Sequence, residues 1–170
     1  MNFSLYDISI PAFIRSLNAL LGILDKAKLH ADTNKIDMSV LFQTRLIPTQ
    51  FPLSKQIQIA CDAAKLFVPR LTDLKAPSFE DKESTFDEFK TRIQETIAFL
   101  ETVTPEDFKL ANTKIISFPW KPGYELAAKD YILQHSLPNF YFHITTAYSI
   151  LRSIGVDLGK SDYLGKISWK

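Results

Sequence analysis

Three polar side chains recur at every fourth position of one long apolar stretch, and their types and spacing could support chemistry. His135, Asn139 and His143 lie in AKDYILQHSLPNFYFHITTAYSILRSIG, the run from 128 to 155. Residues four apart share a face of a helix, so the three side chains should point in similar directions. An imidazole in this position could bind a transition metal, accept a proton, or serve as a hydrogen-bonding group in the core.

The distances along such a helix restrict how these residues can cooperate. His135 and His143 are about 12 Å apart along the axis, at about 1.5 Å per residue, so one metal ion cannot easily bind both. Asn139 with His143 is the workable pair, although an amide oxygen is a poorer ligand for zinc or nickel than an imidazole. The structural alternative is that a hydrogen bond satisfies His143 in the core, while Asn139 binds a carbonyl freed by Pro138.

The stretch itself predicts a helix that is buried on most sides. Asp130 is a suitable N-cap, and Gly155 is a residue that commonly ends helices in a left-handed conformation. Pro138 predicts a kink near Gln134 because it removes one backbone hydrogen bond and crowds the carbonyl four residues earlier. The polar residues in the stretch argue against a membrane span.

Composition indicates one ordinary globular domain over residues 1–170. Hydrophobic residues make up 46% and charged residues 23%, and the net charge of +1 argues against a nucleic-acid or acidic-lipid partner. The single cysteine, Cys61, excludes an internal disulfide, and the first residues have no positively charged region before an apolar one. We therefore expect a cytoplasmic protein that binds neither nucleic acid nor membrane.

Amphipathic spacing predicts three more long helices, whose ranges are given at the end of this paragraph. In the helix that follows Ser84 or Thr85, we expect the charged face, which includes Arg92, to face solvent. The connector 32–53 is long and apolar enough that it should pack over the bundle. Two β-like runs, 114–118 and 124–127, flank a Pro/Gly turn and predict one hairpin. The tail, which includes Trp169, should pack on the bundle or on a second subunit. The expected helix ranges are Ile10 to about His30 or Ala31, Pro52 or Ser54 to Val68, and Ser84 or Thr85 to about residue 103.

The chain is thus expected to be all-α, a four-helix bundle with a long connection between its first and second helices and a small β-hairpin before the last. Gln58 and Asp62 lie at the edge of the inward stripe of the second helix, where Cys61 is typical of a buried small hydrophobe. Phosphate-binding loops, metalloprotease motifs and nucleophile elbows are absent from the sequence. We therefore assign no catalytic nucleophile.

These features make the chain resemble the DinB/YfiT-like four-helix bundles, and within them an uncharacterised branch of small bacterial proteins. The resemblance implies a histidine on the second helix and a His-x-x-x-His pair on the fourth, which together hold a nickel- or zinc-type ion; some members are thiol-dependent transferases or isomerases. In this chain the pair reads Asn139-x-x-x-His143, and the second helix offers Gln58, Cys61 or Asp62 but no histidine. Of the metal-binding residues that the resemblance implies, only His143 has a counterpart in this chain. The segments that carry the resemblance are SLYDISIPAFIRSLNALLGILDKAKLHA, FPLSKQIQIACDAAK, LPNFYFHITTAYSILRSIGVDLGK and DYLG.

Three functional hypotheses follow. The first is a non-enzymatic or unknown-ligand bundle protein, a homodimer with a degenerate or absent metal site, whose inter-helix cavity holds a small apolar ligand or none. The second is a metal-dependent transferase or hydrolase-type enzyme with nickel or zinc at His143, Asn139 and Asp62. In the third, His143 is a general base beside Tyr141 or Asn139 and no metal takes part. Further candidates for the pocket are His135, Gln58 and Tyr141, and the aromatic lining expected for the cavity is Phe140, Tyr141, Phe142 and Tyr148.

Overall fold

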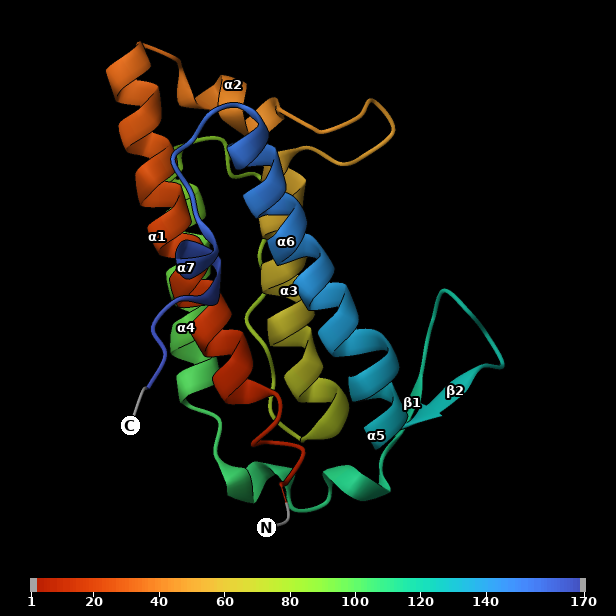
Figure 1. Ribbon diagram of the computed structural model, residues 1–170. Helices are drawn as coiled ribbons and strands as arrows, with labels where there is room; N and C mark the ends of the chain where they lie inside the picture. Colours follow the sequence, from red (N-terminus) through yellow and green to blue (C-terminus); the bar gives the residue numbers. More distant parts are fainter. Residues whose placement is uncertain (1–2, 169–170) are drawn as a thin grey trace.

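In the computed structural model, which describes residues 3–168, four long helices lie side by side and form a bundle (Figure 1). They are α1 (Ile10–Asn34), α3 (Leu53–Leu71), α4 (Phe86–Glu101) and α6 (Leu137–Ser153). The shorter elements are α2 (Met38–Gln43), the turns η1 (Pro105–Phe108) and η2 (Ala111–Thr113), strands β1 (Ile115–Ser117) and β2 (Glu125–Ala127), α5 (Ala128–Asp130), the π-helical turn η3 (Tyr131–Ser136) and α7 (Lys160–Leu164). The predicted all-α bundle, with its long connection and one hairpin, is confirmed.

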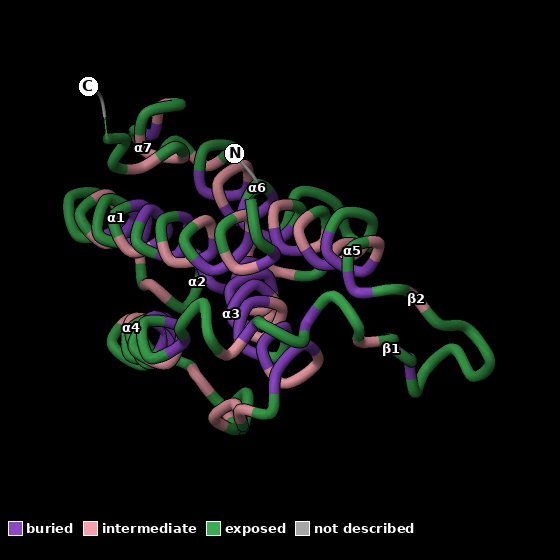
Figure 2. The backbone as a smooth tube through the Cα atoms, turned by 90° about the horizontal axis from the view of Figure 1, so that it is seen from below, coloured by how far each residue is buried: buried purple, intermediate pink, exposed green. Residues whose placement is uncertain are grey.

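Helix α3 lies at the centre of the bundle and is largely buried (Figure 2). It packs most extensively against α6 and also against α4, and small residues such as Ala60 and Ala64 allow this close approach. A cluster of rings joins three helices: Phe13 of α1 lies 5.2 Å from Phe67 of α3 and 4.7 Å from Phe140 of α6, measured between ring centroids. The faces of α3 are therefore fixed relative to both neighbours.

Two helices are longer than their patterns predict. Helix α1 continues to Asn34, because Thr33 and Asn34 each donate a side-chain hydrogen bond to a carbonyl four residues earlier. Helix α3 continues through Pro69 to Leu71, so the expected end at Val68 was wrong. A proline in the last turn forfeits only one backbone hydrogen bond, and the N–H of Thr72 still donates to the carbonyl of Val68 at 2.9 Å.

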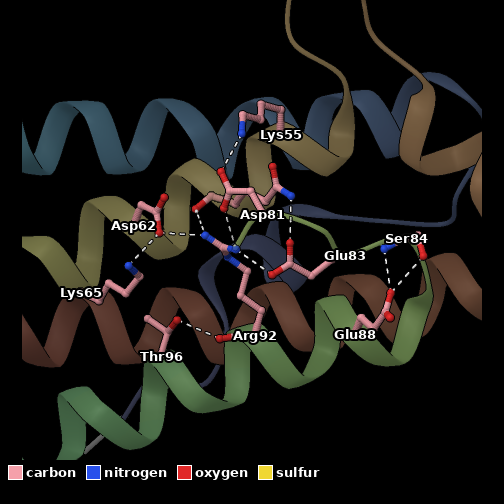
Figure 3. A network of polar contacts seen from close by, with 10 residues as sticks. Lys55, Asp62, Lys65, Asp81, Glu83, Ser84, Glu88, Arg92 and Thr96 are labelled. Atoms are coloured by element: carbon pink, nitrogen blue, oxygen red, sulfur yellow. Dashed lines mark hydrogen bonds and ion pairs between the residues drawn. The ribbon is translucent and has the colours of Figure 1, made fainter. Parts of the chain in front are cut away.

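Helix α4 begins with a capping box in which Thr85 is the N-cap and pairs with Glu88. Its charged face is not all exposed to solvent, however, because Arg92 is only 2% exposed. The segment 72–85 runs across α3 and α4 and brings carboxylates to the guanidinium of Arg92, which allows this charge to be buried (Figure 3).

The last helical run starts at Ala128, and Asp130 is not its N-cap. The backbone N–H of Ala128 instead donates to the carbonyl of Lys114, while Asp130 lies inside the run and accepts a hydrogen bond from Gln134. The disturbance predicted at Pro138 takes the form of the π-helical turn η3, whose wider winding accommodates a proline ring that would crowd the preceding turn. Gly155, with φ of 92°, ends the run as predicted.

The hairpin and the tail occupy opposite sides of the bundle. Strands β1 and β2 pair antiparallel, with Ile116 opposite Leu126, and the hairpin projects from the bundle (Figures 1 and 2). The tail packs back on the bundle, where α7 contacts α1 and Lys26 pairs with Asp162 at 2.8 Å. Trp169 lies outside the described residues. Within residues 3–168, every helix is too short or too polar to cross a membrane.

Candidate functional site

His143 is the most chemically defined of the predicted site residues. It lies on α6, is 7% exposed, and its Nδ1 is 2.7 Å from Oε1 of Gln56 on α3. The orientation of the Gln56 amide follows from its second hydrogen bond, since its Nε2 donates to the carbonyl of Phe51 at 2.9 Å. Oε1 of Gln56 is therefore the acceptor, so Nδ1 of His143 carries the proton and the lone pair lies on Nε2.

The protonation state of His143 is set by its surroundings. Burial lowers the pKa of the imidazole below its ordinary value, because the charged form loses its hydration. The ring is consequently neutral near pH 7. Among the residues that the structure describes, the hydrogen bond of the His143 ring is made by Nδ1, and none is made by Nε2. A neutral imidazole with a free Nε2 can accept a hydrogen bond, take a proton or bind a metal.

The neighbours of His143 on its own helix differ in polarity and in exposure. Asn139, one turn earlier, is half-buried and shares a face with His143, as the spacing predicts. Phe142 is exposed, and its ring meets the His143 ring edge-on at a centroid distance of 5.2 Å. Tyr141 is half-buried and packs edge-on against Phe140 at 5.5 Å. The free Nε2 is thus accompanied by one half-buried amide and one exposed aromatic ring.

Gln58 and Asp62 lie on a different face of α3 from Gln56. Two residues along a helix turn the side chain by about 200°, so Gln58 points away from the side that meets His143. Its Nε2 donates to Glu83 at 2.9 Å. Asp62 pairs with Arg92 at 2.8 Å. Figure 3 shows Asp62 and Glu83, the partner of Gln58, in one polar network around Arg92, and His143 is not among its labelled residues.

That network is centred on Arg92 and is structural. The guanidinium pairs with three carboxylates, those of Asp62 at 2.8 Å, Asp81 at 2.9 Å and Glu83 at 2.7 Å. Burial raises the pKa of the Glu83 carboxyl, but the hydrogen bonds from Arg92 and Gln58 outweigh this effect and leave the pKa below its ordinary value. The network ties the segment 72–85 to α3 and α4.

His135 has surroundings of its own. Its ring lies 5.3 Å from Phe118, 6.2 Å from Trp120 and 5.7 Å from Tyr131, between ring centroids. Phe118 and Trp120 belong to the hairpin segment, whereas His143 meets α3. The two histidines therefore have different sets of neighbours.

The aromatic residues expected to line an inter-helix cavity do not surround one common space. Phe140 is buried in the core against Phe13, whereas Phe142 is exposed. Tyr148 packs edge-on against Tyr163 at 5.8 Å. Cys61 is fully buried beside Thr96, and burial raises the pKa of its thiol to about 12, so it is not a reactive nucleophile.

The donor set near His143 fits a zinc or nickel ion poorly. Within residues 3–168, no group of three His, Cys, Asp or Glu side chains is placed to hold a metal ion. The amides of Gln56 and Asn139 are weak ligands for these ions, and Asp62 is engaged by Arg92.

Gln56 is the residue that the sequence pattern could have identified and did not. It is three residues after Leu53 and four before Ala60, both of which belong to the buried stripe of α3. A polar side chain at such a position must find a partner inside the bundle. A search for polar residues within the stripe, as well as at its edge, would have found it.

A family model described as a domain of unknown function (DUF1993) matches residues 5–164. A crystal structure of a DinB family member protein from Shewanella denitrificans is 45% identical, covers 98% of this chain and 94% of its own, and superposes with a TM-score of 0.94. No curated protein matches the chain.

Proposed function

The chain belongs to the family described as a domain of unknown function (DUF1993) and is a DinB-like four-helix bundle, and we propose that this bundle binds a small molecule through Nε2 of His143. The ligand donates a hydrogen bond or a proton to Nε2 and places apolar surface against the exposed ring of Phe142. In this account no zinc- or nickel-type ion is needed.

The observation that carries the proposal is the hydrogen-bond chain from His143 through Gln56 to the carbonyl of Phe51. It holds the imidazole in the tautomer whose Nε2 is an acceptor, and it restricts the orientation of the ring. A base oriented by a neighbouring group in this way is prepared to take a proton from a bound molecule. Since burial also disfavours the imidazolium, this acceptor remains available near pH 7.

The second candidate function is a metal-dependent transferase or hydrolase-type enzyme centred on His143. The same geometry supports it, because metal-binding histidines commonly donate their other ring N–H to an oxygen acceptor such as that of Gln56. His143 and Asn139 would hold the ion, which would act as a Lewis acid or activate water. The absence of a third strong donor near them makes this candidate the weaker one.

One experiment separates the two candidates. Untagged protein is equilibrated with nickel, zinc and manganese, and its metal content is measured by mass spectrometry for wild type, His143→Ala and the matched control His30→Ala. A ¹⁵N NMR screen of small molecules then follows the imidazole of His143. Metal at trace level, with ligands that shift the Nε2 resonance, supports the proposal. Stoichiometric metal that only His143→Ala loses overturns it, as does a screen in which no molecule shifts Nε2.

The connector supports a further part of this proposal, a homodimer. Three of its large apolar side chains, Val40, Ile47 and Phe51, are each more than half exposed. Exposed apolar side chains of this kind are typical of contact surfaces. The expected result is a dimeric mass by light scattering, which the substitution Ile47→Asp reduces to that of a monomer.

The fully buried free thiol of Cys61 suits a reducing compartment, which supports the cytoplasm as the location.

A further inference from the structure

A separate pocket lies between the β-hairpin and the π-helical turn η3, and it does not involve His143. Its volume is about 200 Å³, and the residues that form its walls include Phe118, Trp120, Tyr124 and His135. Pockets for drug-sized ligands occupy about 300–1,000 Å³, so this one suits a smaller molecule.

The walls of the pocket are largely flat and aromatic. Trp120 and Tyr124 are 62% and 61% exposed, although side chains of this size are usually covered. Phe118 is buried, meets Trp120 edge-on at 5.0 Å, and lies 5.3 Å from the ring of His135. Two exposed rings beside two packed rings form a surface on which a planar ring could stack.

His135 contributes its imidazole to the walls of the pocket. Its Nδ1 is buried and has no hydrogen-bond partner among the described residues. The ring is held in place, because it stacks on Tyr131 with an interplanar angle of 21° within the π-helical turn. A buried polar atom without a partner costs free energy, and π-helical turns occur frequently at functional sites. These two features single out His135 among the residues that form the walls.

The charges around the pocket narrow the class of ligand. The guanidinium of Arg70 lies 5.5 Å from the ring centroids of both Trp120 and Tyr131, and the ammonium of Lys121 lies 4.2 Å from that of Tyr124. The protein's own cations therefore already interact with the ring faces that would attract a cationic ligand. The one carboxylate among the wall residues, that of Glu125, accepts a hydrogen bond from Ser117.

From these features we propose that the pocket binds a small planar aromatic molecule, uncharged or anionic, that stacks beside Trp120 and hydrogen-bonds the imidazole of His135. This site is independent of the one proposed at His143. Its two recognition elements, the aromatic walls and the imidazole, can be tested separately.

The test follows the indole N–H of Trp120 by NMR in the full chain with Trp169→Phe, which leaves Trp120 as the only tryptophan. Four probes are titrated: benzamide, benzoate, cyclohexanecarboxamide and benzyltrimethylammonium. Benzamide and benzoate should shift the Trp120 signal saturably, whereas the non-planar amide and the cation should bind at least tenfold more weakly. No shift with any probe overturns the proposal. So does equal binding of benzamide and cyclohexanecarboxamide, or a preference for the cation.

Variants assign the contacts. His135→Phe keeps a ring but removes both imidazole nitrogens, and should weaken the binding of benzamide at least tenfold. Trp120→Ala, followed by calorimetry, should abolish it. Phe3→Ala, which removes an exposed aromatic side chain elsewhere, should leave binding unchanged. Unchanged affinity in both His135→Phe and Trp120→Ala, with the fold confirmed by thermal unfolding, contradicts the proposal.

Discussion

Gln56 and His143 form a buried hydrogen bond of 2.7 Å that joins the two most extensively packed helices of the bundle. The bond satisfies both polar side chains and also decides which nitrogen of the imidazole remains free. Because the amide of Gln56 is held in turn by Phe51, the chemistry available at His143 depends on the start of α3 as well as on α6.

Removing one side chain of this pair should lower the free energy of unfolding. Gln56→Leu leaves the N–H of Nδ1 of His143 without a partner in a buried site, so the free energy of unfolding should fall by about 1–3 kcal/mol. Urea unfolding measures the loss. The matched control is Gln134→Ala, which removes an exposed hydrogen bond to Asp130 and should change stability by less than about 0.5 kcal/mol.

A double-mutant cycle then isolates the pair. In a His143→Leu background, Gln56→Leu should cost less than in wild type, because no buried imidazole N–H is left unpaired. Equal costs of Gln56→Leu in the two backgrounds would show that the two side chains are not coupled.

Stability should depend on the protonation of the histidines. Burial lowers the pKa of His143, and burial together with Arg70 lowers that of His135, so the folded state binds fewer protons than the unfolded state. Stability should therefore be full at pH 7.5 and fall as the pH drops below about 6.5, the unfolded value for histidine.

Urea unfolding between pH 7.5 and 5.5 measures this slope. The substitution His143→Gln should make the slope shallower, and adding His135→Gln should reduce it further. A slope unchanged in the double variant would assign the pH dependence to other groups.

Arg92 should be among the most sensitive positions outside the core. Arg92→Met removes the single guanidinium shared by Asp62, Asp81 and Glu83, and leaves their charges close together. Breaking a buried ion pair on one side typically costs about 3–5 kcal/mol, and we expect a loss of that order in chemical unfolding. Lys82→Met, which removes an exposed ion pair with Glu80, should have little effect. Similar losses for the two variants would contradict the structural role of Arg92.

The fold was predictable because its signals are local. Apolar spacing identifies the four long helices, Thr85 and Glu88 form the capping box that their types predict, and the turn between two β-like runs forms the hairpin. The errors are at boundaries. Pro69 is tolerated inside the end of α3 because a proline in the last turn forfeits only one backbone hydrogen bond. Asp130 lies within a run that already starts at Ala128, whose N–H donates to the carbonyl of Lys114.

The site was predictable only in part, because it depends on contacts between helices. Spacing correctly places Asn139 and His143 on one face, but it cannot tell which side of α3 meets that face. Gln58 and Asp62 are engaged by Glu83 and Arg92, from a segment and a helix later in the chain. The partner of His143 is Gln56, which only the packing of α3 against α6 reveals.

The most direct test of the central claim is the ¹⁵N NMR spectrum of the His143 imidazole in untagged protein near pH 7. We predict a neutral ring with the proton on Nδ1 and an unprotonated, metal-free Nε2. The Nε2 resonance should shift when a hydrogen-bond donor binds. A proton on Nε2, or a stoichiometric metal bound there, would contradict the account.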